Sequence, residues 1–217
     1  MSLKPAYAIV GFDFDSTLSR LEGIDELGVR SGMGQQMAEL THSAMNGQVA
    51  LESVYGQRLA LIRPDTGAIA WLAERYIAES VPGVEALFEQ LLAQNKTVHI
   101  ISGGIRQAIL PMARKLGLPD ENVHAVELYF APDGSYRGFD ADSPLARSGG
   151  KADVCRTINP NGLDMVMVGD GQTDLESKQA GASFIGFGGV VNRLAVRQGA
   201  DYFFEGDSLT PLMDLIH

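Results

Sequence analysis

Two carboxylates separated by a single residue, Asp13 and Asp15, are the first side chains in the sequence that could carry out chemistry. They follow an apolar run over residues 6–12, which predicts a buried strand of a parallel sheet. Open α/β sheets bind their ligands where such strands end. Two acids this close repel each other unless a cation lies between them or one is protonated, which favours a divalent metal with oxygen ligands, Mg²⁺ foremost. We therefore expect Asp13 to act as a nucleophile and Asp15 as a proton shuttle.

Three later segments carry polar groups suited to phosphoryl chemistry. Ser102-Gly103-Gly104 follows an apolar run and precedes a helical pattern, so its hydroxyl and backbone N–H groups would hold a phosphate at a helix start. Lys151 opens another helical pattern, where its ammonium would neutralise the charge that grows on a transferring phosphoryl group. Asp170 and Asp174 follow a further apolar run and supply two more acids for the metal. Each segment is common by itself, but their order at successive strand ends predicts one shared site.

The elements that must position these residues follow from the hydrophobic pattern. From residue 82 onwards, strand-like apolar runs alternate with helical patterns, which predicts a doubly wound parallel sheet. Residues 19–80 contain apolar stripes at helical spacing and no convincing strand, which predicts a helical cap inserted after the first strand. We therefore expect an α/β core formed by residues 1–18 and 81–217, with the cap lying over its site.

Two turns are also predicted. Pro132-Asp133-Gly134 has the composition of a tight turn and lies between two short apolar runs, residues 126–130 and 136–139, which predicts a small β-hairpin. Ser102-Gly103-Gly104 is expected to form a turn between a strand over residues 97–101 and the helix that follows.

The composition argues against several classes of partner. The 217 residues include 45% hydrophobic and 20% charged residues, which are ordinary values for a globular protein. A formal net charge of −10 argues against nucleic acid, whose phosphates require basic surfaces. No apolar run approaches the roughly 20 residues of a membrane span and the N-terminus lacks a signal-peptide core, so no membrane partner is expected. The sequence contains a single cysteine, Cys155, so no internal disulfide can form and the expected location is the cytoplasm. The chain is expected to act as a monomer or homodimer.

The four chemical segments, in this order, resemble the four signature motifs of the haloacid dehalogenase superfamily of aspartate-nucleophile phosphatases, and the resemblance covers nearly the whole chain. It implies a Rossmann-like core with a helical cap, one Mg²⁺, and a phosphomonoester hydrolase that forms an aspartyl phosphate on Asp13. It also implies that Asp15 protonates the leaving oxygen and then deprotonates the hydrolytic water. The same resemblance assigns metal binding to the Asp13 and Asp170 side chains and the Asp15 carbonyl, contact with the metal's waters to Asp174, and phosphoryl binding to Ser102, Gly103 and Lys151.

Two charged residues of the expected cap limit the range of possible substrates. Glu22 and Arg58 together suit a zwitterion, because an arginine forks onto a carboxylate and a glutamate pairs with an ammonium. The segments around both residues resemble family members that hydrolyse phosphoserine, which implies O-phospho-L-serine as the small-molecule substrate and the last step of serine biosynthesis as the setting. The resemblance also implies substrate contacts for Met45 and Thr173. Asn46 stands where that resemblance leads us to expect a glycine.

Two other interpretations stay open. A phosphatase or phosphotransferase for another small amine-bearing phosphate, such as phosphohomoserine, would use the same residues. A phospho-receiver signalling module also combines clustered acids, a phosphorylatable Asp, a hydroxyl and a Lys, but the helical stretch over residues 19–80 has no use in it. Sustained release of phosphate, rather than one phosphoryl group per chain, separates an enzyme from such a module.

Overall fold

The computed structural model describes residues 7–45 and 51–216 of the chain. Its centre is a six-stranded sheet in the order β3-β2-β1-β6-β7-β8, in which every neighbouring pair is parallel. The strands are β1 (Ile9–Phe12), β2 (Thr97–Ile105), β3 (Val123–Val126), β6 (Met165–Gly169), β7 (Ser183–Phe187) and β8 (Tyr202–Phe204).

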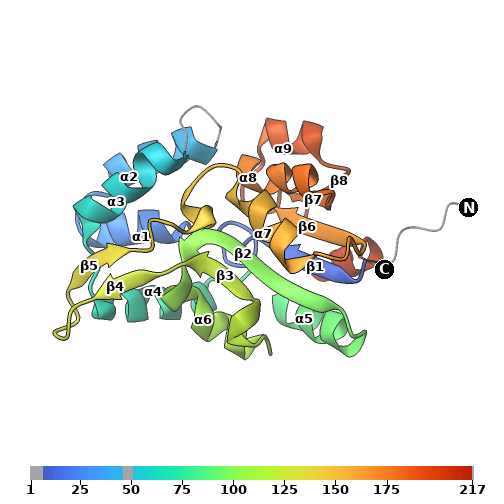
Figure 1. Cartoon of the computed structure of the whole chain (residues 1–217), viewed down its shortest axis with the longest axis horizontal. Coiled ribbons are helices and arrows are strands. Elements are labelled where there is room, and N and C mark those ends of the chain that lie inside the picture. The colour runs from blue at the N-terminus through green and yellow to red at the C-terminus, as the bar shows by residue number, and fades with distance from the viewer. Residues whose placement is uncertain (1–6, 46–50, 217) are drawn as a thin grey trace, which may run out of the picture.

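Strand β1 lies in the middle of this sheet, as its unbroken apolar sequence requires. All four of its residues are buried, and it pairs with β2 on one side and β6 on the other. Helices α5 (Val84–Ala93) and α6 (Arg106–Lys115) lie on one side of the sheet, and α7 (Gly150–Ile158), α8 (Gln172–Leu175) and α9 (Leu194–Gly199) on the other (Figure 1). The predicted doubly wound parallel sheet is therefore confirmed. The strand order reverses between β1 and β6, which makes their carboxyl ends the expected place for a ligand.

Between β1 and α5, the described residues form four helices: α1 (Gly23–Arg30), α2 (Gly34–Met45), α3 (Leu51–Ile62) and α4 (Thr66–Ala78). The chain leaves and re-enters the sheet region at one place, where Ser19 and Ser80 form an antiparallel bridge. Phe14, just after β1, packs edge-on against Tyr76 of α4 with 4.7 Å between the ring centres. The four helices gather at one end of the sheet (Figure 1). Among the helices of the described residues, none combines the length and the apolar content that a membrane crossing requires.

A small antiparallel hairpin, β4 (Leu128–Phe130) and β5 (Tyr136–Phe139), extends beside these helices (Figure 1). The predicted turn joins its strands, and Gly134 in that turn has a φ of +84°, which glycine adopts without strain. The carbonyl of Gly134 accepts a 3.0 Å hydrogen bond from the backbone N–H of Thr66 at the start of α4. The predicted hairpin is confirmed, and its tip touches the helical segment.

Two predicted boundaries are wrong. Ser102-Gly103-Gly104 does not form a turn, because β2 continues through it to Ile105. The pairing of β2 with β3 shifts register between Ile101 and Ile105, so the intervening residues are extended without a regular strand partner on that side. The predicted strand over residues 126–130 divides in two, because β3 ends at Val126 and the chain leaves the main sheet before β4 begins. The extension of β2 places residues 102–105 beyond the end of β1, whose last residue, Phe12, pairs with Ile100.

Candidate active site

Four buried charged side chains meet beyond the carboxyl ends of β1 and β6. The Lys151 Nζ lies 2.7 Å from Asp13 Oδ1 and 2.5 Å from Asp174 Oδ1. Asp13, Asp170 and Asp174 each offer a carboxylate oxygen, and these oxygens lie within 4.8 Å of one another. The structure thus brings together the acids of two strand ends and the lysine that begins α7, which are far apart in the sequence.

Two glycines allow this close approach. A Cβ atom on Gly169 would collide with the Asp174 carboxyl group, so only glycine at the end of β6 lets that carboxyl fold back over the strand. The backbone N–H of Gly171 then donates to Asp174 Oδ2 over 2.8 Å. A Cβ atom on Gly150 would collide with the Pro144 carbonyl, so the start of α7, which carries Lys151, can press against the preceding turn. The glycine-rich composition of both segments therefore has a packing cause.

Burial governs the ionisation of this cluster. Burial raises the pKa of Asp174 to about 7, the negative charge of Asp13 adds to the shift, and Lys151 opposes it. Burial also disfavours the ammonium of Lys151, but the charges of Asp13 and Asp174 outweigh that penalty and raise the pKa of Lys151. The lysine is thus held in its charged form, and the carboxyl groups around it favour a further positive charge.

Asp15 has one oxygen that accepts from two donors and one that faces the Ser102–Gly104 segment. The hydroxyl of Tyr76 and the N–H of Gly23 donate to Oδ1 over 2.7 and 2.8 Å. Oδ2 faces Gly104, where an added Cβ atom would lie 2.8 Å from it. Burial raises the pKa of Asp15 to about 7, against the lowering effect of the Tyr76 hydrogen bond. A carboxyl group with such a pKa can both give and take a proton near neutral pH.

Ser102 and Gly103 line the same pocket as Asp13 and Asp15. Ser102 is buried, and its Oγ accepts a 3.0 Å hydrogen bond from the N–H of Gly104. The Ser102 hydroxyl hydrogen is therefore directed away from that N–H and can be donated to another acceptor. Thr173, from the first turn of α8, is half-buried and also lines the pocket.

Glu22 and Arg58 reach this pocket from the helical segment. Glu22 accepts a 2.7 Å hydrogen bond from the hydroxyl of Ser16. Burial raises the pKa of Glu22 to about 8, and the charge of Asp15 adds to the shift. The Arg58 side chain is buried on α3, and burial lowers its pKa while neighbouring charges, Asp25 among them, raise it. An acid and a guanidinium thus lie in the pocket that Asp13, Ser102 and Lys151 also line.

The structure does not describe two of the predicted features, the side chain of Met45 and the residue Asn46. Met45 is the last residue of α2, but its side chain is not among the described groups. Asn46 lies outside the described residues altogether. The substrate contact expected for Met45 therefore stays a prediction.

Arg193, in the loop after β7, is a site residue that the sequence analysis missed. Its Nη1 donates to the carboxylate of Asp170 and, over 3.1 Å, to the Asp170 backbone carbonyl. Its Nη2 lies 3.8 Å from Glu22 Oε1. No motif or periodicity marks this arginine, and only the return of the chain to the sheet at β7 brings it to the site. Tyr76 was missed for a related reason, because an aromatic residue on a helical apolar stripe looks like packing.

The charges of the site favour a divalent metal. Five carboxyl groups, those of Asp13, Asp15, Glu22, Asp170 and Asp174, gather in and around the pocket, and the cationic side chains near them are those of Lys151, Arg58, Arg147 and Arg193. The acids outnumber the cations, and three of the acids lie together, so the site favours a further positive charge. The donors of the three-aspartate group are carboxylate oxygens only, as hard cations such as Mg²⁺ prefer. The residues present therefore fit a metal ion.

The pocket is small and contains most of the predicted residues. Its cavity volume is about 50 Å³, which suits a small ligand better than a macromolecule. Asp170 and Asp174 are not among its lining residues, but each offers a carboxylate oxygen within 4.8 Å of one of Asp13, and Asp174 pairs with Lys151. The predicted residues that line it directly are Asp13, Asp15, Glu22, Arg58, Ser102, Gly103, Lys151 and Thr173.

Comparisons with known proteins agree with this chemistry. The family model of the haloacid dehalogenase-like hydrolases matches residues 10–177. A chloroplastic phosphoserine phosphatase of Arabidopsis thaliana is 41% identical over 210 residues, which cover 94% of this chain and 71% of that protein. The phosphoserine phosphatase of Homo sapiens is 39% identical over 196 residues, covering 89% and 87%. A solved phosphoserine phosphatase complex with bound substrate has a TM-score of 0.83 and 25% identity, with all of both chains covered.

Proposed function

The chain belongs to the haloacid dehalogenase-like hydrolase family, and from this premise we propose that it is a phosphoserine phosphatase, which hydrolyses O-phospho-L-serine to L-serine and phosphate. The observation that carries the proposal is one pocket in which a buried carboxylate–lysine cluster adjoins Glu22 and Arg58. The cluster suits phosphoryl transfer, and the pair suits the ammonium and carboxylate of an amino acid. Relatives at 39–41% identity bear the name of this activity.

The reaction proceeds in two steps on the chain's own carboxylates. An oxygen of Asp13 attacks phosphorus, the bond from phosphorus to the serine oxygen breaks, and Asp15 gives its proton to that oxygen. Asp15 then takes a proton from water, which attacks the aspartyl phosphate and releases phosphate. Lys151, the Ser102 hydroxyl and the Gly103 N–H hold the phosphoryl oxygens during both steps.

Magnesium is the metal that we propose for this site. The side chains of Asp13 and Asp170 and the backbone carbonyl of Asp15 would hold it, with Asp174 contacting its waters. Bound there, Mg²⁺ supplies positive charge that neutralises the carboxylates and the phosphoryl oxygens. The three buried aspartates, whose carboxylate oxygens lie within 4.8 Å of one another, support this assignment.

Substrate selection is assigned to the helical segment, which we propose to act as a cap over residues 81–217 and 1–18. Arg58 would bind the substrate carboxylate with its N–H groups, and Glu22 would accept from the ammonium. The bridge between Ser19 and Ser80 supports the boundary of the cap at residues 19–80, because the chain enters and leaves the segment there. Thr173 and Met45 are proposed as further substrate contacts. We also place the enzyme in the cytoplasm, which the single buried cysteine, Cys155, supports.

Arg58→Ala tests the substrate assignment. We expect kcat/KM for phosphoserine to fall about 100-fold, because the variant loses a buried charge-assisted contact to the carboxylate. The kcat/KM for phosphoethanolamine, which has the ammonium but no carboxylate, should change less than about threefold. The matched control is Arg63→Ala on the exposed end of the same helical region, whose guanidinium donates to the Tyr136 carbonyl of the hairpin. An equal loss on both esters would make Arg58 a structural residue.

Removal of divalent metal is expected to stop the reaction. After treatment with a chelator, phosphate release should fall below about 1% of the initial rate, because the repulsion among the buried acids is then uncompensated. Addition of Mg²⁺ should restore the rate, whereas K⁺ at equal ionic strength should not. Undiminished activity in the metal-depleted enzyme would remove the metal from the proposal.

The proposed function is tested by phosphate release from a panel of esters in the presence of Mg²⁺. We expect phosphoserine to be preferred over phosphothreonine, phosphoethanolamine and phosphohomoserine, and many phosphates to be released per chain. Preference for phosphohomoserine would favour the related small-substrate phosphatase. Release of no more than one phosphate per chain would favour a phospho-receiver module.

A further inference from the structure

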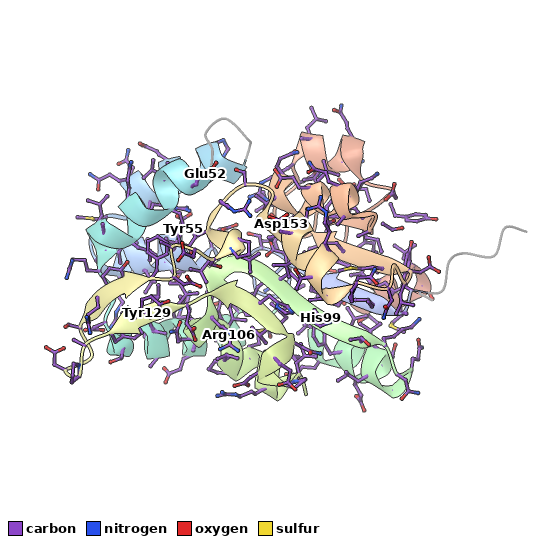
Figure 2. The ribbon with its side chains drawn as sticks, viewed as in Figure 1. Glu52, Tyr55, His99, Arg106, Tyr129 and Asp153 are labelled. Carbon is purple, nitrogen blue, oxygen red and sulfur yellow. The ribbon has the colours of Figure 1, made fainter. Side chains whose placement is uncertain are left out.

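Helix α3 contacts the phosphate-binding segment of β2 directly through Tyr55. Its hydroxyl donates a 2.9 Å hydrogen bond to the carbonyl oxygen of Gly103. The side chain, labelled in Figure 2, is only 3% exposed. Its ring packs against Phe139 of the hairpin with 5.4 Å between ring centres. Burial raises the pKa of Tyr55, so the hydroxyl keeps its proton and stays a donor. No motif in the sequence marks this tyrosine.

The carbonyl that Tyr55 holds belongs to a peptide group whose other end faces Ser102. Because the peptide bond is planar, fixing the Gly103 carbonyl also fixes the direction of the Gly104 N–H. That N–H donates to Ser102 Oγ over 3.0 Å. Hydrogen bonds arranged in such a chain polarise and strengthen one another. The orientation of the Ser102 hydroxyl therefore depends, through one peptide plane, on a side chain of the helical segment.

We propose that Tyr55 is a positioning residue. Through it, the docking of α3 against β2 sets the orientation in which the Ser102 hydroxyl donates to a phosphoryl oxygen. This inference rests on the proposed function, in which Ser102 donates to a phosphoryl oxygen. With Tyr55 in place, the Gly103–Gly104 peptide is held at both ends and Ser102 donates towards the pocket. When α3 moves away, the carbonyl loses its donor and the peptide is free to rotate. The phosphoryl site is then complete only when the segment that selects the substrate is docked.

A second contact between α3 and the core provides a control. Glu52 Oε2 accepts hydrogen bonds of 3.0 Å from both the N–H and the hydroxyl of Ser148. Glu52 is exposed and lies on α3 (Figure 2), and the hydrogen bonds that its side chain accepts come from Ser148. Exposed contacts of this kind contribute little to the free energy of folding. Loss of the Glu52 contact therefore loosens the same helix without disturbing the peptide that Tyr55 holds.

The test is a double-mutant cycle of Tyr55→Phe with Ser102→Ala, measured as kcat/KM. Tyr55→Phe removes one hydroxyl and keeps the ring. We expect it to lower kcat/KM about five- to tenfold in the wild-type background and less than about twofold in the Ser102→Ala background. The kcat/KM values for phosphoserine and phosphoethanolamine should fall by the same factor, since the contacts from Tyr55 to Ser102 act on the phosphoryl group and not on the carboxylate. Glu52→Ala, which removes the acceptor of both Ser148 hydrogen bonds, should change kcat/KM for either ester less than about twofold.

Three results would overturn the proposal: an effect of Tyr55→Phe below twofold in the wild-type background, an equal factor in both backgrounds, or a fall in melting temperature of more than about 5 °C, which would make the role structural. The proposed function fails separately, if the wild-type chain does not prefer phosphoserine. In that case the same cycle, measured on phosphoethanolamine or an aryl phosphate, still decides the role of Tyr55.

Discussion

Asp13→Asn is expected to lower phosphate release from phosphoserine by about 10⁴-fold or more, the order of loss seen when a covalent nucleophile is removed. An amide oxygen is a poor nucleophile and cannot carry the phosphoryl group through the reaction. The change leaves the shape of the side chain almost unaltered. The measurement is the steady-state rate of phosphate release with saturating Mg²⁺.

The fold should survive this substitution, because Lys151 keeps its 2.5 Å ion pair with Asp174. Thermal unfolding of the two proteins without metal is therefore the control. A folded Asp13→Asn variant that retains more than a few per cent of the wild-type rate would show that another group takes the phosphoryl group. If the variant were inactive because it does not fold, its unfolding curve would show no cooperative transition.

Lys151→Met is expected to have the second-largest effect, and on two observables at once. Phosphate release should fall about 10²–10³-fold, because a preorganised charge on the phosphoryl oxygens is lost. The free energy of unfolding of the metal-free protein should fall by about 3 kcal/mol, since Asp13 and Asp174 stay buried without their cation. Methionine keeps most of the side-chain volume, so the loss reports charge and not packing.

Lys178→Met is the matched control for this prediction. Lys178 forms a 2.6 Å ion pair with Asp201, and both side chains are more than one-third exposed. Exposed pairs of this kind contribute about 1 kcal/mol or less, and this lysine lies away from the pocket. We expect neither activity nor stability to change measurably in this variant. A Lys151→Met enzyme within fivefold of the wild-type rate would contradict the assignment of Lys151 to phosphoryl binding.

Much of the architecture followed from local patterns. The unbroken apolar run at β1 indicated a buried parallel strand, and the alternation of strands and helices after residue 82 indicated a doubly wound sheet. Two boundaries failed because tertiary pairing decided them. Ser102–Gly104 has the composition of a turn, yet the segment stays extended in β2, and the apolar run over residues 126–130 hides the point where the chain leaves the main sheet.

The residues of the site also fall into two groups, those with a local signal in the sequence and those without one. Asp13, Asp15 and Lys151 could be predicted because each lies at the end of an apolar run or the start of a helix, where ligands bind. Tyr76 could not, because nothing in α4 distinguishes a hydroxyl that donates to Asp15 from an aromatic ring that only packs. Arg193 contacts Asp170 across 23 residues, and no periodicity records that contact. Residues that support a site from a distant part of the chain leave little local signal.

The most direct test of the account is to find the covalent intermediate. The enzyme with Mg²⁺ is mixed with phosphoserine, quenched in acid within milliseconds, digested and analysed by mass spectrometry. We expect the peptide that contains Asp13 and Asp15 to gain the mass of one phosphoryl group, with fragmentation placing that group on Asp13 and no gain in the Asp13→Asn variant. Phosphate released at the full rate with no phosphoryl group on Asp13 at any quench time, or with the group on another residue, would contradict the account.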